Sequence, residues 1–382
     1  MRAIIILTFA TLLSSRAARA EVTFEDILEN VKRNEALYEN HDVKLTLEYE
    51  MGNVEAAKIM QTPGGPVVSE EIKAMSSSMH YVSQNGLFRL DRKGTNTTSS
   101  AELSADCTRA FDGTTTRLYA QGAIGNIIPG REQDHDFMYP HMLLERKGAH
   151  VPLSTFLSGM NAFEAHPLGE RHEGQRFEYT YMGEDEVDGL RCHMVWSTII
   201  QEPDLPLARA EFWLAEDRNY MPVRTRGFYY NYAKDIPCEE GVASDFREIG
   251  PGIWFPFRAE VTLYDGMTLM MQRKLEVRGR YRFAVEEASL HPSYEQAYFK
   301  DVVFPDGTAV YEVENSQIKK IYRIGAPDAH AGGEGKSKRW WLIVAFNAAA
   351  ALAVVVVVAT SVVRRRARRA IAVSSVKGVP GA

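Results

Sequence analysis

The sequence of 382 residues predicts an α+β protein: one large curved antiparallel sheet over a small helical layer, followed by one C-terminal transmembrane helix. Strand-like alternation recurs through most of the chain between residues 43 and 324, and glycine-containing turn signals separate the strands. Helical periodicity is confined to the early part of the chain. A third observation predicts the membrane helix: residues 340–363 are almost charge-free, and about 20 apolar residues suffice to cross a hydrocarbon core of about 30 Å.

Residues 1–20 have the pattern of a secretory signal peptide. Arg2 precedes the apolar stretch 4–13, which is short for a stable membrane anchor, and Ala18-Arg19-Ala20 offers small residues at the cleavage positions. We expect the mature chain to begin at Glu21. An uncleaved anchor is the alternative.

The first element of the body is a predicted helix from Phe24 to about Asn40. Thr23 is placed to cap it, with Asp26 three residues later near the positive helix end. Apolar residues then recur at helical spacing. After the helix the period changes to two, which predicts a strand from Val43 to Tyr49 with one solvated face.

Strands joined by short turns follow, and such connections favour antiparallel neighbours. Asn85-Gly86 and Asp188-Gly189 are strong hairpin signals, because both central residues of a type I′ turn need positive φ. The predicted strands are 79–83, 87–91, 117–120, 176–182, 191–200, 208–215, 221–230, 244–249, 253–264, 267–283 and 310–324. Between them, the pattern breaks over residues 122–160, which we interpret as a lid or long loop with a short helix at 152–157.

These segments predict a single-pass type I membrane protein of the inner membrane. Residues 21–325 form the exported domain on the periplasmic side, and 326–339, rich in Gly, Ala and Lys, form a flexible tether. Residues 340–363 cross the membrane, and Trp340 and Trp341 suit the headgroup region at one end. The Arg-rich tail, 364–382, stays cytoplasmic because arginines are costly to translocate.

Charge argues against two kinds of partner. The whole chain has a net charge of −6, but its ends are basic: three arginines precede residue 21, and Arg339 and six further cations lie at the C-terminus. Segment 21–338 therefore carries −16, which argues against nucleic-acid binding and against the domain lying on an anionic lipid surface. The three cysteines, Cys107, Cys192 and Cys238, allow at most one disulfide bond within the chain.

No motif in the sequence indicates catalysis or a cofactor. Leu157-Ser158-Gly159 lacks the Gly-x-Ser-x-Gly elbow, and the chain has no phosphate-binding glycine loop and no CxxC pair. The best metal candidate, Asp134-His135-Asp136 with His141, matches no ligand spacing, so we predict no metal site. We predict that the protein is not an enzyme and needs no cofactor.

Aromatic and methionine residues are the most prominent feature of the predicted strands. They include Trp196, Trp213, Phe228 and Trp254, and Met267, Met270 and Met271 add adaptable side chains. An ordinary core beneath the helices explains most of them. However, a strongly curved sheet with few helices has more apolar surface than those helices can cover, and the excess would line a cavity.

Several segments resemble the LolA-like superfamily, the fold of periplasmic lipoprotein carriers. The resemblance covers roughly residues 22–324: a signal peptide, a helix ahead of strand Val43–Tyr49, and a hairpin series. Within it, Glu211–Arg224 resembles that family's strand, acidic turn and Leu-Pro-like start of the next strand. Val187–Cys192 and Gly252–Pro256 resemble pieces of membrane-tethered relatives. Unlike the soluble carrier, this chain is longer and carries a predicted span.

The resemblance implies a half-barrel of antiparallel sheet, closed by a helical lid, with an apolar cavity for acyl chains. It therefore implies a lipid, a lipoprotein acyl chain or another apolar ligand as the partner. We expect one face of two strands to line the cavity, with Phe212, Leu214, Ile253, Phe255 and Phe257 as the lining residues. A shift of one residue in register would turn each side chain to the other face.

Two other functions are weighed against ligand binding. The chain could be an envelope sensor or regulator that signals through its span to a membrane or cytoplasmic partner protein, since a tail of 19 residues is too short for an effector domain. A third hypothesis is that the protein is a hydrolase of the cell envelope that uses Asp134, His135 and His141.

Overall fold

The computed structural model describes residues 22–52, 72–98, 100–120, 124–131, 143–144, 152–157, 175–201, 203–314 and 317–325. The chain divides into two units, Met1–Gly325 and Ala326–Ala382, and every described residue belongs to the first. The predicted signal peptide, tether, membrane helix and tail therefore lie outside the described residues. Within the described part, no helix is both long and apolar enough to cross a membrane.

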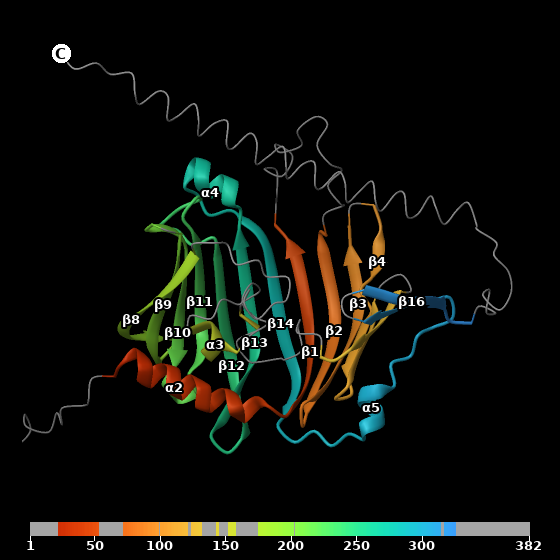
Figure 1. The fold of residues 1–382 in the computed structure, drawn as a ribbon. Helices are drawn as coiled ribbons and strands as arrows, with labels where there is room; N and C mark the ends of the chain where they lie inside the picture. Colours follow the sequence, from red (N-terminus) through yellow and green to blue (C-terminus); the bar gives the residue numbers. More distant parts are fainter. Residues whose placement is uncertain are drawn as a thin grey trace, which may run out of the picture. The chain divides into compact units, whose positions relative to one another are not determined.

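A single sheet of 16 strands makes up the described domain (Figure 1). The first part of the chain contributes β1 (His41–Met51), β2 (Ala74–Gln84), β3 (Leu87–Thr97), β4 (Glu102–Ser104), β5 (Cys107–Phe111), β6 (Thr115–Ala120) and β7 (Ile124–Pro129). The later part of the chain contributes β8 (Gln175–Val187), β9 (Leu190–Gln201), β10 (Leu205–Ala215), β11 (Met221–Tyr229), β12 (Glu239–Gly250), β13 (Ile253–Tyr264), β14 (Val277–Ser289), β15 (Ala309–Glu314) and β16 (Gln317–Arg323). The large antiparallel sheet with few helices confirms that part of the predicted fold class.

The strand order shows how the two halves of the chain join. It runs β16-β15-β7-β6-β5-β3-β2-β1-β14-β13-β12-β11-β10-β9-β8, with β4 paired to β3. β1 pairs with both β2 and β14, so the first strand of the chain joins the early hairpins to the late ones. The strand pairs are antiparallel except β7–β15, which is parallel. A parallel pair requires a crossover, and the segment with α5 (Gln296–Lys300) provides it by passing over β3 and β5.

Tight turns set the register of the hairpins. Asn85 and Gly86 have φ of 52° and 79°, and Asp188 and Gly189 have the same pair of values. Both pairs thus adopt the positive-φ turn that the sequence predicts. Glycine adopts this conformation without the steric cost of a β-carbon, and the short polar side chains of asparagine and aspartate can offset that cost by local hydrogen bonding.

α2 (Phe24–Glu35) is the longest described helix, and its start is a full capping box. The Thr23 hydroxyl accepts from the Asp26 amide at 3.2 Å, and the Asp26 carboxylate accepts from the Thr23 amide at 2.9 Å. The helix is shorter than predicted, because the chain tightens into the 3₁₀ turn η1 (Ala36–Tyr38) before β1. Figure 1 shows α2 crossing one end of the strands from β8 to β13.

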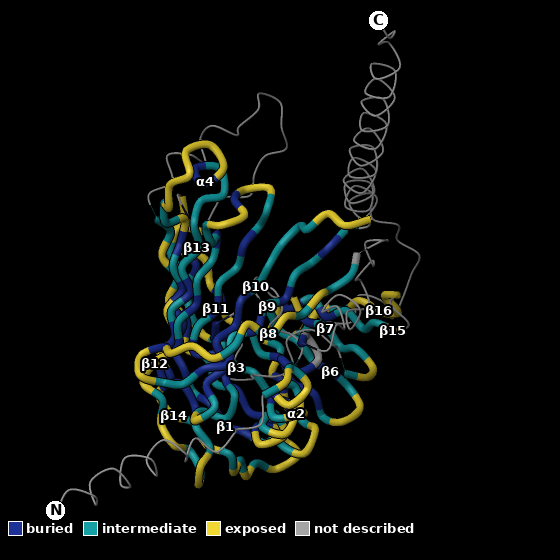
Figure 2. Tube along the Cα trace, turned by 90° about the vertical axis from the view of Figure 1, so that its left-hand side faces the viewer, coloured by how far each residue is buried: buried dark blue, intermediate teal, exposed yellow. Residues whose placement is uncertain are grey.

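Three other predicted segments need correction. The strand predicted at 310–324 is two antiparallel strands, β15 and β16. The strand predicted at 267–283 is split: α4 (Gly266–Gln272) comes first, capped by Asp265 and ended by Arg273 in the left-handed conformation, and β14 begins only at Val277. The segment 122–160 is not all irregular, since it contains β7. Its predicted short helix is confirmed as α3 (Leu153–Leu157). Figure 2 shows α4 largely exposed and the buried stretches concentrated in strands such as β11 and β13.

Candidate ligand-binding face

The inner face, defined here as the face of the sheet that packs against α2, begins at β9 and β10. Ile27 and Val31 lie one turn apart on α2 and are buried in an apolar cluster. The rest of that cluster comes from α3, β9 and β10: Leu153, Leu157, Val195, Phe212 and Leu214. Two short helices therefore cover this end of the inner face.

Strand pairing extends the inner face from β10 to β13. Residues directly opposite each other in neighbouring strands share a face. Phe212 pairs with Thr225, Thr225 with Gly241, and Gly241 with Val261. Because side chains alternate along a strand, the odd-numbered residues from 253 to 263 lie on the same face as Phe212.

The five residues predicted to line a cavity, Phe212, Leu214, Ile253, Phe255 and Phe257, therefore share the inner face. The first two belong to the cluster beneath α2 and α3. The other three belong to a second cluster, around β1, β13 and β14. Four of the five have exposed fractions between 0 and 6 %, and Ile253 is half-buried. In this structure they form core, with the Arg247 guanidinium 4.2 Å from the centre of the Phe257 ring.

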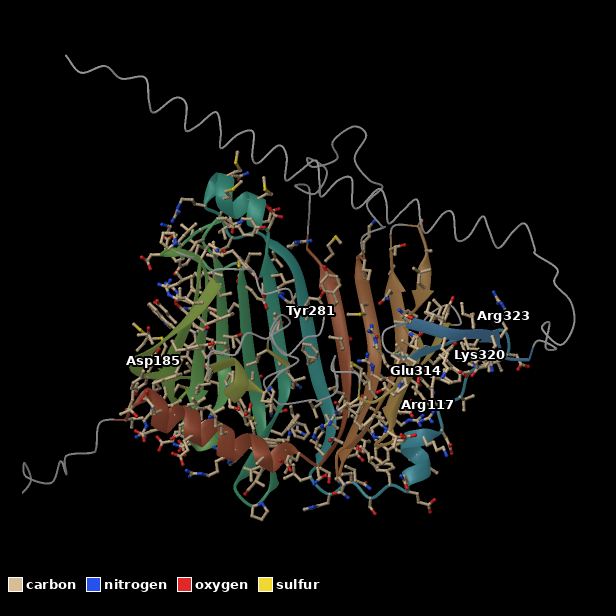
Figure 3. All side chains as sticks on the ribbon, viewed as in Figure 1. Arg117, Asp185, Tyr281, Glu314, Lys320 and Arg323 are labelled. Carbon is tan, nitrogen blue, oxygen red and sulfur yellow. The ribbon has the colours of Figure 1, made fainter. Side chains whose placement is uncertain are left out.

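Among the described residues, few from outside the sheet belong to the second cluster. Its buried members that are not in strands are Tyr38 of η1, Leu143 and Leu144. Tyr49 and Tyr281 pair across β1 and β14 with ring centres 4.4 Å apart, and Figure 3 shows Tyr281 on β14 near the middle of the sheet. Half-buried apolar side chains surround this part: Tyr49, Met75, Met79, Leu90, Ile253, Leu263 and Phe283.

At the far edge of the sheet, the inner face is apolar and exposed. Cys107 pairs with Ala120, Ala120 with Ile124, and Ile124 with Ala309, so the face continues to β15. In β16, the partners of Tyr311 and Val313 are Ile321 and Ile318. Ile124, Ile318 and Ile321 have exposed fractions of 46, 58 and 46 %. Figure 3 shows the charged residues Glu314, Lys320 and Arg323 of the same hairpin at this edge.

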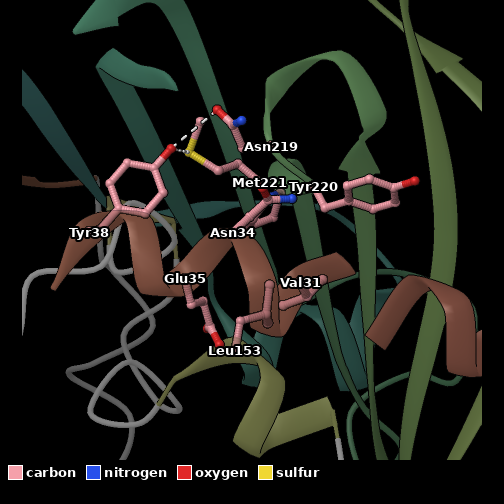
Figure 4. A pocket seen from close by; sticks show the side chains of 9 residues that line it. Val31, Asn34, Glu35, Tyr38, Leu153, Asn219, Tyr220 and Met221 are labelled. Atoms are coloured by element: carbon pink, nitrogen blue, oxygen red, sulfur yellow. Dashed lines mark hydrogen bonds between the residues drawn. The ribbon is translucent and has the colours of Figure 1, made fainter. Parts of the chain in front are cut away.

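A small cavity lies between α2, α3 and the β10–β11 turn (Figure 4). Its volume is about 20 Å³, enough for a water molecule but not for an acyl chain. Its lining residues are Val31, Asn34, Glu35, Tyr38, Leu153, Asn219, Tyr220, Met221 and Pro222. This cavity marks the contact between helix and turn.

Two polar groups at that cavity hold the helical layer in place. The Glu35 carboxylate accepts from the Ser154 amide at 3.2 and 3.3 Å, at the start of α3. Burial raises the pKa of Glu35 above its ordinary value, although the bonds from Ser154 oppose this. The Tyr38 hydroxyl donates to the Trp254 carbonyl at 2.6 Å, which ties η1 to β13.

The described residues contain no group of three His, Cys, Asp or Glu side chains that could hold a metal ion. The residues weighed as a metal site, 134–136 and 141, lie outside the described ranges. Cys107, Cys192 and Cys238 are all free thiols, so the structure contains none of the disulfide bonds that the sequence allowed.

Sequence reasoning missed the inner-face residues of β2 and β3. Met75, Ser77, Met79 and Tyr81 alternate with polar residues on β2, a signal that extends the predicted strand toward its start. The inner-face residues of β3 include Phe88, Leu90 and Arg92. The sequence alone shows that Arg92 occupies a position where the alternation predicts an apolar residue.

No protein-family model and no curated protein matches the chain in sequence. Solved structures similar to it include a DUF1329 family protein from Desulfovibrio piger, at 14 % identity and a TM-score of 0.35, covering 72 % of this chain and 96 % of that one. A putative outer membrane lipoprotein-sorting protein domain from Vibrio parahaemolyticus shows 12 % identity and a TM-score of 0.35, with 71 and 95 % covered.

A LolA superfamily protein from Nitrosomonas europaea shows 9 % identity and a TM-score of 0.34, with 73 % of this chain and 98 % of that one covered. This is the superfamily that the sequence resembles. The chain is thus similar to lipoprotein-sorting and LolA superfamily structures.

Proposed function

We propose that the protein is a membrane-anchored exported protein that binds a lipid, a lipoprotein acyl chain or another apolar ligand on the inner face of its sheet. One observation carries the proposal: the apolar inner face extends well beyond the part packed by α2 and α3. It continues over β13, β14, β1 and β2 and ends exposed at β16. Burying apolar surface gains about 25 cal/mol per Å², so this face favours an acyl chain over water.

The predicted tether supports capture or delivery at a membrane. β16 ends at Arg323, and the apolar run that we predict to span the bilayer begins at residue 340. As a flexible linker, the 14 residues 326–339 would have a typical end-to-end distance of about 20 Å. A ligand-binding domain on such a tether would act at the membrane surface and not as a long-range carrier.

Lipid extraction from the purified full-length chain, followed by mass spectrometry, tests the proposal. We expect an apolar ligand in stoichiometric amount from the unaltered chain. Met79→Asp places a charge on the half-buried inner face of β2, and we expect it to reduce the recovered ligand at least tenfold. Ser78→Asp is the matched control, because it adds the same charge one residue away on the exposed outer face.

Two results would contradict the proposal. One is a chain that carries no apolar ligand and takes up none from mixed vesicles. The other is an equal loss of ligand in both variants, which would show that charge alone, and not the inner face, governs the association. Circular dichroism of both variants establishes that each is folded.

A further inference from the structure

Arg92 lies on the inner face of the sheet, among apolar side chains. It follows Phe88 and Leu90 at every second position of β3. Its partners in the neighbouring strands are Met79 of β2 and Cys107 of β5. A guanidinium therefore lies on the inner face between the side chains of Met79 and Cys107.

Within the described ranges, no carboxylate forms an ion pair with the Arg92 guanidinium. Its Nε donates to the Ser77 hydroxyl at 3.0 Å, and its Nη2 lies 2.7 Å from the Met75 sulfur, a weak acceptor. Burial lowers the pKa of Arg92 below its ordinary value. An incompletely bonded, half-buried cation is costly, so its position calls for an explanation other than stability.

Arg89, on the same strand, shows how a structural arginine is bonded in this chain. It lies on the outer face, and its guanidinium forms a two-point ion pair with the Asp91 carboxylate at 2.7 and 3.1 Å. It also donates to the carbonyl oxygens of Tyr298 and Asp301, at 2.6 and 3.1 Å. These bonds fix the α5 segment on the sheet. Among the described residues, the Arg92 guanidinium forms no comparable set of bonds.

A second arginine lies beside Arg92 on the inner face. Arg109 pairs with Leu90 across β3 and β5, which places it on that face, and it is 8 % exposed. Burial raises the pKa of the Cys107 thiol, and the guanidiniums of Arg109 and Arg92 act in the opposite direction. Both guanidiniums are therefore close to the same thiol.

We propose that Arg92 binds the anionic headgroup, a phosphate or carboxylate, of an amphiphile whose apolar chain lies on the inner face beside Met79 and Leu90. The planar guanidinium suits two-point bonding to either anion, and its Nη1 has no partner in the described part of the chain. The proposal rests on the proposed function and adds the class of ligand: an anionic lipid and not a neutral one.

Binding to the delipidated full-length chain in detergent, measured by native mass spectrometry, tests this inference. The probes are dioleoyl phosphatidylglycerol, dioleoylglycerol with the same chains but no phosphate, and inorganic phosphate. We expect the anionic lipid to bind roughly tenfold more tightly than the neutral one, the gain of about one charge-assisted hydrogen bond. Arg92→Gln should abolish this preference, Arg92→Lys should restore part of it, and Arg89→Gln should leave it intact.

The outcomes separate this inference from the function on which it rests. Equal binding of both lipids, or a preference that survives in Arg92→Gln, overturns the headgroup site while the apolar face stands. Binding of neither lipid overturns both. Inorganic phosphate bound as tightly as the anionic lipid would indicate a site for free anions and would also overturn the inference.

Thermal unfolding without lipid gives a second, independent readout. If the cation serves a ligand, Arg92→Gln should be at least as stable as the unaltered chain, whereas Arg89→Gln should melt at a lower temperature because Asp91 loses its ion pair. A Tm that falls for Arg92→Gln as far as for Arg89→Gln would assign Arg92 a structural role instead.

Discussion

His41 is the buried titratable residue whose environment is clearest. Its side chain is 1 % exposed at the start of β1, and its ring stacks on that of Tyr81 with centres 5.3 Å apart. Nδ1 lies 2.7 Å from the Tyr38 carbonyl oxygen, to which it donates. Burial lowers the pKa of His41 to about 4, against the opposing effects of that bond and of Asp42.

The pKa of His41 predicts a pH dependence of stability. The unfolded chain has a His pKa of about 6.5, so the folded state binds this proton less readily. The contribution of neutral His41 is complete above about pH 6.5 and declines as the pH falls toward 4, by on the order of 3 kcal/mol. We expect His41→Asn, which retains a donor for Tyr38, to flatten the dependence of the free energy of unfolding on pH in this window. Urea titrations at pH 4 to 7 measure it.

His291→Asn is the control for that series, because its residue lies on an exposed segment after β14. Two results would contradict the assignment of the pH dependence to the buried ring. One is a dependence of the free energy of unfolding on pH that is reduced equally in His291→Asn. The other is a dependence that is unchanged in His41→Asn.

Among the elements, α2 begins at one capping box. The capping box at Thr23 and Asp26 satisfies amides at the helix N-terminus, and the helix places Ile27 and Val31 over β9 and β10. We expect Thr23→Ala to lower the free energy of unfolding by about 1 kcal/mol. Thr23→Ser, which keeps the hydroxyl, should lose much less. Denaturant unfolding compares them, and equal losses would show that the cap contributes little.

The sequence predicts an element well when neighbouring residues alone determine its conformation. Asn85-Gly86 and Asp188-Gly189 fix hairpins by backbone sterics alone, so the sequence predicted these turns correctly. α4 was missed although Asp265 offered a cap, because the apolar residues around Met270 read equally well as a strand. The shared face of Phe212 and Phe255 followed from alternation.

Burial of those site residues could not be predicted in the same way. It depends on which segments pack over the sheet, such as α3 and Leu144, and nothing in the local pattern of β10 or β13 encodes that contact. The alternation in β3 offered a signal for Arg92, but its contacts with Ser77 and Met75 depend on strand pairing and could not be predicted from that strand alone.

For the whole molecule, the exposed edge of the inner face should determine access to membranes. Ile318→Asp places a charge on β16, where the side chain is 58 % exposed, so folding should be unaffected. We expect it to slow uptake of a fluorescent lipid from vesicles by the full-length chain severalfold. Leu205→Asp, 60 % exposed at the start of β10, is the matched control and should leave the rate unchanged. Equal rates for both variants would contradict a role for this edge.

The central claim is that the inner face, and not another surface, holds an apolar ligand. Photo-crosslinking tests it most directly: the full-length chain is loaded with a phospholipid that carries a diazirine in its acyl chain, irradiated, digested and mapped by mass spectrometry. We expect adducts on inner-face residues of β1, β2, β13 and β14, such as Leu47, Met79 and Phe283. Adducts confined to outer-face residues such as Thr46 and Ser78, or no adducts in a chain that has taken up the lipid, would contradict the account.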